Sequence, residues 1–176
     1  MMTRVPEVTF KVRARDESFS DYTWKNLTTS DLFAGKRVVV FSLPGAFTPT
    51  CSNFQLPGFD AAFDDFISLG IDDIYCVSVN DSFVMNAWFK GLNISNVKPI
   101  PDGNSEFTHS MGMAVAKCNL GFGFRSWRYA MVVDDGNIEQ MFVEDGKVGN
   151  ADTDPYEVST PENVLQYLKT YSRKDV

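Results

Sequence analysis

One pattern restricts the possible folds of this chain more than any other: a short buried strand that leads through a Pro/Gly-rich turn into a helix. The apolar residues 38–41 predict a central strand over residues 37–43. Pro44 and Gly45 then form the turn, and Cys51 follows where the helix is expected to begin. The first N–H groups of a helix have no partner within it, so they stabilise a thiolate placed there. This arrangement predicts that Cys51 is a reactive, accessible thiol.

Hydrophobic patterning along the rest of the chain alternates between strands and helices. Further strands are expected at residues 8–12, 22–27, 71–79, 97–100, 127–133 and 138–143, the last two joined as a hairpin. Helices are expected at residues 29–35, 51–70, 80–90, 105–114 and 159–171, and Pro57 should kink the second about one turn earlier. The alternation predicts an α/β protein whose sheet is packed on both faces. With no linker or repeat, the chain is expected to form a single domain over residues 1–176.

Composition and charge exclude several classes of function. A net charge of −7 repels phosphate groups, so neither nucleic acid nor an anionic membrane is expected as a partner. No apolar run is long enough to span a membrane, and no secretory signal is expected. The three cysteines show no disulfide framework, which favours a reducing cytoplasm. The chain has a single histidine and lacks a Cys-x-x-Cys pair, so it offers few ligands for zinc and no metal site is expected.

The turn carries a motif that resembles the active site of peroxiredoxins. Pro44, Thr48 and Cys51 occupy the positions of that family's signature, P-x-x-x-T-x-x-C. The continuation over residues 52–59, which ends in Leu-Pro-Gly-Phe, is similar to the type II subfamily, also called type five. Far downstream, Arg128 in the string Arg-Ser-Trp-Arg-Tyr-Ala matches the family's active-site arginine. The resemblance covers most of the chain. It implies a thioredoxin-like fold, with a central mixed sheet flanked by helices and an N-terminal β extension.

The resemblance also implies that Cys51 reduces hydrogen peroxide and alkyl hydroperoxides through a sulfenic acid, with a thiol reductant and no other cofactor. Lowering the thiol pKa from about 8.5 to about 6 would raise the thiolate fraction at pH 7 about thirtyfold but lower the nucleophilicity of the thiolate about thirteenfold, so a low pKa alone gains only about twofold. Useful rate must come from groups that act as the O–O bond breaks. Thr48 is expected to accept from the peroxide O–H, and Arg128 to donate to the sulfur and the peroxide oxygens. Pro44 is expected to shield the sulfur from water.

The sequence leaves open how oxidised Cys51 is returned to the thiol. Cys76 stands where plant-like members of the subfamily carry a second cysteine, but it also suits a small buried residue in a core strand. It lies about 13 Å inside the expected sheet, so a disulfide with Cys51 would require local unfolding. The other family arrangement places the resolving cysteine where this chain has Val158, and Cys118 matches neither arrangement. The expected reductant is therefore glutathione, with or without glutaredoxin, or thioredoxin.

Expectations also follow for three residues outside the motif and for the oligomeric state. Gln55 stands where relatives often carry histidine, and this difference is expected to alter partner docking rather than peroxide chemistry. Arg125 is a second candidate guanidinium, although the motif places the role on Arg128. His109 is expected to be a surface or capping residue rather than a catalytic base. The family resemblance also suggests a homodimer.

Two alternative functions remain open. The thioredoxin-like pattern is compatible with a thiol–disulfide exchange enzyme, although the chain lacks the Cys-x-x-Cys pair of such enzymes. A non-enzymatic peroxide sensor would instead pass its oxidation to a bound protein. Reduction of insulin disulfides would favour the first alternative, and a stable mixed disulfide with one protein would favour the second.

Overall fold

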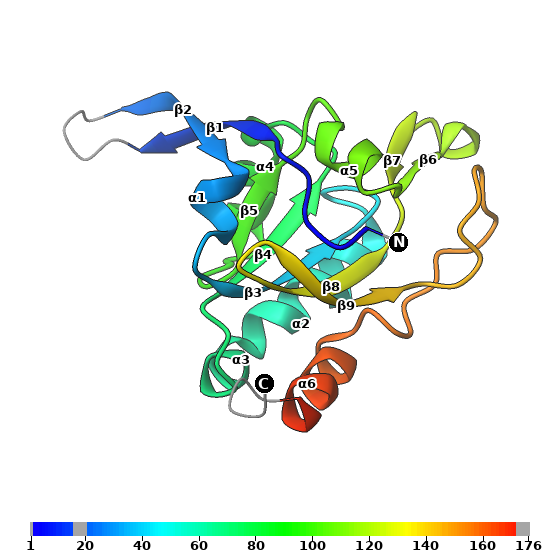
Figure 1. The fold of residues 1–176 in the computed structure, drawn as a ribbon. Helices are drawn as coiled ribbons and strands as arrows, with labels where there is room; N and C mark the ends of the chain where they lie inside the picture. The colour runs from blue at the N-terminus through cyan, green and yellow to red at the C-terminus, as the bar shows by residue number, and fades with distance from the viewer. Residues whose placement is uncertain (1, 16–20, 172–176) are drawn as a thin grey trace.

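A five-stranded mixed sheet forms the centre of the computed structural model, which describes residues 2–15 and 21–171. Its strands are β3 (Arg37–Ser42), β4 (Asp73–Ser78), β5 (Lys98–Pro101), β8 (Tyr129–Asp134) and β9 (Asn137–Val143), in the order β5-β4-β3-β8-β9 (Figure 1). β3, β4 and β5 are parallel, whereas β8 runs antiparallel to β3 and to β9. The central mixed sheet expected from the sequence is therefore confirmed.

Neighbouring residues along β3 point to opposite faces of the sheet, and both faces are buried. Val38 and Val40 pack into one apolar core, and Val39 and Phe41 pack into the other. Helices α2 (Leu56–Ala61), α3 (Phe63–Ser68), α4 (Ser82–Gly91) and α6 (Pro161–Thr170) contribute buried side chains to the second core. The first core is closed by α1 (Thr29–Phe33), α5 (Glu106–Ser110) and the N-terminal hairpin. Cys51 belongs to the second core.

Two small hairpins lie outside the central sheet. β1 (Thr9–Arg15) and β2 (Tyr22–Thr28) form the expected N-terminal β extension, which projects to one side in Figure 1. β6 (Ala114–Ala116) and β7 (Phe124–Ser126) pair around the 3-10 turn η2 (Cys118–Leu120), and none of these three elements was expected. The helix expected over residues 105–114 ends early, because Gly112 has a φ of 70° and the chain then enters β6.

The helix that follows the turn is not a regular α-helix. Residues 51–55 form the π-helical turn η1 (Cys51–Gln55), in which the Leu56 N–H donates to the Cys51 carbonyl oxygen. The helical hydrogen-bond pattern is therefore irregular one turn before Pro57, where a kink was expected, and Pro57 itself lies in the first turn of α2. A second break at Ala62, which separates α2 from α3, was not expected. π-Turns within helices occur frequently at functional sites.

Within the described ranges 2–15 and 21–171, no helix is long and apolar enough to cross a membrane.

Candidate active site

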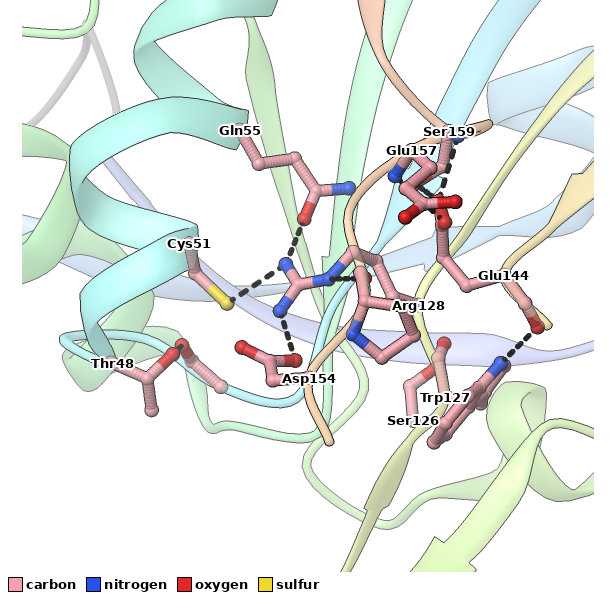
Figure 2. A network of polar contacts seen from close by, with 12 residues as sticks. Thr48, Cys51, Gln55, Ser126, Trp127, Arg128, Glu144, Asp154, Glu157 and Ser159 are labelled. Atoms are coloured by element: carbon pink, nitrogen blue, oxygen red, sulfur yellow. Dashed lines mark hydrogen bonds and ion pairs between the residues drawn. The ribbon is translucent and has the colours of Figure 1, made fainter. Parts of the chain in front are cut away.

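Cys51 lies in the first turn of the helical segment that follows β3. The chain becomes helical at Pro49, and the Ser52 N–H donates to the Thr48 carbonyl oxygen at 3.0 Å. The cysteine side chain is 0% exposed, so the expectation of an accessible thiol is wrong for this structure. Figure 2 shows the sulfur pointing inward toward the buried Arg128, which explains the difference.

Arg128, which directly precedes β8, joins its own segment of the chain to two others, η1 and residues 154–155. Its Nη1 donates to the Cys51 sulfur at 3.5 Å and also to Gln55 Oε1. Its Nη2 donates to Asp154 Oδ1 at 2.5 Å, and its Nε donates to the Pro155 carbonyl oxygen at 3.1 Å (Figure 2). The side chain is only 1% exposed. The structure therefore places the motif cysteine and arginine in contact, although 77 positions separate them in the sequence.

Two guanidinium groups give the site its positive charge. Burial lowers the pKa of Arg128, but the negative charges of Cys51 and Asp154 outweigh burial and raise that pKa overall. Burial lowers the pKa of Arg125, and the Cys51 sulfur partly opposes this change. Because arginine in proteins does not lose its proton at neutral pH, both groups stay cationic. A thiolate at Cys51 therefore has one contacting cation and a second one nearby.

The turn before Cys51 is held by hydrogen bonds within it and from Arg125. The Thr48 hydroxyl donates to the Gly45 carbonyl oxygen at 2.7 Å, which leaves the lone pairs of the hydroxyl oxygen free to accept a proton donor. Arg125 Nη1 donates to the carbonyl oxygen of the buried Pro44 at 3.2 Å. A Cβ at position 45 would require the Arg125 guanidinium to move, because Nη1 of that arginine packs directly against Gly45. Phe47 has a φ of 65°, a strained conformation for a bulky residue.

Gln55 belongs to the site rather than to a docking surface. It is 0% exposed, and its amide oxygen accepts from Arg128 within the same network as Cys51. The interpretation that this residue alters partner docking is therefore corrected. The π-turn explains its position, because it directs the Gln55 and Cys51 side chains toward one guanidinium. The Gln55 amide nitrogen is buried without a hydrogen-bond partner among the described residues.

A segment that we call the C-terminal strap, residues 144–159, supplies the remaining contacts of Arg128. The buried carboxylate of Glu144 anchors both ends of the strap (Figure 2). It accepts from the backbone N–H groups of Glu157 (2.8 Å), Val158 (3.0 Å) and Ser159 (2.8 Å), and from the Ser159 hydroxyl (2.7 Å). Burial alone would raise the pKa of Glu144, but these hydrogen bonds outweigh burial and lower it.

Three residues of this network were not predicted from the sequence: Glu144, Asp154 and Pro155. All three lie at a strand end or in a loop, where hydrophobic periodicity carries no information. The Asp-Pro pair suggests a turn, but no local pattern shows that this turn folds back onto an arginine 26 positions earlier.

The other sequence candidates lie apart from this network. Cys76 is buried in β4 opposite Phe41, and burial, together with the charge at Cys51, raises the pKa of its thiol. Cys118 is exposed in η2, and none of the described cysteines forms a disulfide. His109 lies in the last turn of α5 and is exposed, in agreement with a surface residue, and its Nδ1 contacts the Ser105 carbonyl oxygen at 2.9 Å. Within the described residues, no cluster of three or more histidine, cysteine or acidic side chains could hold a metal ion.

A cavity of about 460 Å³ adjoins the site. Its wall includes Pro44 and Thr48 from the turn, Asp152 and Asp154 from the strap, and Leu120 from η2. Two of these residues connect the cavity to the site. The Thr48 carbonyl oxygen accepts from the N–H of Ser52, the neighbour of Cys51, and Asp154 accepts from Arg128. Cys51 itself does not line the cavity, so a small molecule held there would contact the site through Thr48 and Asp154.

Comparisons with known sequences point to one family. Residues 4–158 match the family model described as Redoxin. A peroxiredoxin of Rhizobium etli is 59% identical over 172 residues, which cover 96% of each chain. A peroxiredoxin of Synechocystis is 55% identical over 169 residues, which cover 94% of this chain and 89% of the relative.

Solved structures show the same likeness. The antioxidant protein of Plasmodium falciparum, a 1-Cys peroxiredoxin, has a TM-score of 0.90 at 40% identity, with 96% of this chain and 98% of that chain covered. Reduced Prx3 of Vibrio vulnificus, in complex with hydrogen peroxide, has a TM-score of 0.82 at 35% identity, with 96% of each chain covered. These likenesses confirm the expected thioredoxin-like α/β fold.

Proposed function

This chain belongs to the peroxiredoxin family, and from that premise we propose that Cys51 is the thiol with which it reduces peroxides. Its close relatives indicate a thiol-dependent peroxidase with an antioxidant function. The observation that supports Cys51 is the contact between its sulfur and Arg128 Nη1 at 3.5 Å. Among the described residues, no guanidinium or ammonium group donates a hydrogen bond to Cys76, which is buried within a strand.

The proposed reaction oxidises the sulfur by two electrons. The Cys51 thiolate attacks one oxygen of the peroxide, an S–O bond forms, and the O–O bond breaks. The second oxygen leaves with the bonding pair and takes up a proton, which gives water from hydrogen peroxide or an alcohol from an alkyl hydroperoxide. Cys51 becomes a sulfenic acid, the first step of cysteine oxidation.

Arg128 and Thr48 act on the transition state of this reaction. Negative charge moves from the sulfur to the leaving oxygen, and a guanidinium already fixed by three other acceptors can donate to both without rearranging. The Thr48 hydroxyl donates to Gly45, so its oxygen can accept from the peroxide O–H and orient the peroxide. Pro44 is buried beside the turn and limits the access of water to the sulfur.

We further propose that an external thiol reduces the sulfenic acid. One thiol condenses with it to release water and form a mixed disulfide, and a second thiol then releases Cys51. Glutathione, with or without glutaredoxin, or thioredoxin would supply these thiols. The burial of Cys76 and the presence of Val158 at the other resolving position support an external reductant over an internal one.

We also propose that the protein acts as a homodimer in the cytoplasm. Several large apolar side chains are exposed on the elements around the site: Phe47 (61%), Phe54 (62%), Leu120 (56%) and Phe124 (58%). Exposed apolar groups of this kind support a protein interface. The three reduced cysteines support a reducing compartment.

Turnover by a cysteine variant tests the role of Cys51. We expect Cys51→Ser to abolish hydrogen peroxide reduction with glutathione and glutaredoxin, whereas Cys118→Ser should retain it. Turnover by Cys51→Ser at the wild-type rate would refute the assignment. Reduction of insulin disulfides by the wild type would instead favour a thiol–disulfide exchange enzyme. A stable mixed disulfide with one protein, without turnover of a small thiol, would favour a sensor.

A further inference from the structure

Asp154 joins the buried site to the surface. One carboxylate oxygen accepts from Arg128 Nη2 at 2.5 Å. The Arg128 side chain is 1% exposed, whereas that of Asp154 is 47% exposed. The aspartate therefore places a negative charge at the point where solvent reaches the arginine.

The exposed charges on the wall of the adjoining cavity are negative. Asp152 and Asp154 both line the cavity and are both exposed. Lys117 also lines it, but this side chain is only 4% exposed, and its ammonium group lies 5.7 Å from the centre of the Trp127 ring. An incoming molecule therefore meets two exposed carboxylates on the cavity wall, where Lys117 is buried. Arg125 is half-buried and donates to the Pro44 carbonyl oxygen, but it does not line the cavity.

From this arrangement we infer that Asp154 determines the charge selectivity of peroxide reduction, favouring neutral hydroperoxides over those that carry a carboxylate. Two effects act in the same direction. The carboxylate repels an anion that enters the cavity, and it also occupies Arg128 Nη2, which would otherwise bind a second carboxylate. The inference rests on the proposed reaction at Cys51 and on entry of the peroxide from this cavity, whose wall includes Thr48 and Asp154.

A matched pair of substrates tests this inference. Cumene hydroperoxide is neutral, and its para-carboxylate analogue has nearly the same shape with one negative charge. The variant Asp154→Asn keeps an oxygen that can accept from Arg128 but removes the charge. We expect it to raise the ratio of kcat/KM for the charged over the neutral substrate about fourfold at low salt, the factor for removing one charge about 5 Å from another in water. The increase should shrink toward onefold near 1 M salt, because salt screens such charges.

Asp64→Asn provides the control, because Asp64 is exposed on α3 and its replacement changes the net charge by the same amount. This variant should leave the ratio at the wild-type value. An unchanged ratio in Asp154→Asn, even with both rates reduced, would overturn the inference, and so would an equal increase in Asp64→Asn. Failure of the wild type to reduce even the neutral substrate would instead contradict the proposed function at Cys51, and the selectivity with it.

Discussion

At the scale of single residues, the site depends on an arginine that is buried and held on three sides. Arg128 is fixed by Gln55, Asp154 and the Pro155 carbonyl, so its contact with the Cys51 sulfur is set before any peroxide arrives. Fixed donors stabilise a developing charge more effectively than donors that must first be ordered. We therefore attribute the rate of the reaction to the geometry of the guanidinium, and not to its charge alone.

This view predicts unequal effects for two arginine-to-lysine changes. Arg128→Lys keeps a positive charge but loses the fork of N–H groups, and we expect it to slow oxidation of Cys51 by hydrogen peroxide about 100-fold. Arg125→Lys should have a much smaller effect, because Arg125 contacts the Pro44 carbonyl and not the sulfur. Stopped-flow measurement of the second-order rate constant compares the two. Equal losses in the two variants would show that positive charge alone matters.

The residues of the motif could be predicted from the sequence, whereas the residues that hold Arg128 in place could not. Pro44, Thr48 and Cys51 lie in one turn, so their mutual placement follows from local spacing, and the resemblance supplied Arg128. Asp154 acts only through a tertiary contact with an arginine 26 positions away. Nothing in its local sequence indicates that contact.

At the scale of elements, the C-terminal strap depends on one buried carboxylate. Glu144 follows β9 directly and accepts from three backbone N–H groups and one hydroxyl near the end of the strap. The strap in turn carries Asp154 and Pro155 to Arg128. The stability of this loop and the geometry of the site are therefore linked.

Replacing this carboxylate should destabilise the protein in a pH-dependent way. We expect Glu144→Gln to lower the free energy of unfolding at pH 7 by about 2 kcal/mol, since a charged acceptor becomes a neutral one. The pKa of Glu144 is lower in the folded protein than its usual value of 4.5, so its stabilising effect is full above pH 4.5 and is lost as the pH falls through the lower folded value. Urea unfolding of both proteins at pH 7 and pH 3 measures the difference.

The matched control is Glu157→Gln, in which an exposed side chain is changed and only the backbone N–H contacts Glu144. It should unfold like the wild type at both pH values. A difference between wild type and Glu144→Gln that stays constant down to pH 3 would contradict the role of the ionised carboxylate.

Elements were predicted best where hydrophobic patterning is strong. All five strands of the central sheet were found. β3, β4 and β8 are marked by continuous apolar runs, and β9 was placed by the Asp-Gly turn that joins it to β8. The hairpin of β6 and β7 was missed, because strands of three residues are too short to show alternation. An irregularity before Pro57 was anticipated from its missing N–H, but local sequence did not indicate the π-helical turn, whose Cys51 and Gln55 both contact Arg128.

At the scale of the whole molecule, the exposed apolar side chains around the site predict self-association. We expect sedimentation velocity to give a mass near twice 19.7 kDa for the wild type. Phe47→Asp should shift the protein toward the monomer, because it places a charge among these side chains and aspartate tolerates the positive φ at this position. Phe83→Asp, an exposed site on α4, should remain dimeric. A wild type that sediments as a monomer, or equal dissociation of both variants, would contradict this interface.

We propose that peroxide oxidises the Cys51 sulfur, and chemical trapping followed by mass spectrometry locates the oxidised atom. The protein is treated with one equivalent of hydrogen peroxide in the presence of dimedone, which captures a sulfenic acid, and the adduct is located by peptide mapping. We expect the dimedone adduct on the peptide that contains Cys51. An adduct on Cys76 or Cys118, with the Cys51 thiol intact, would contradict it.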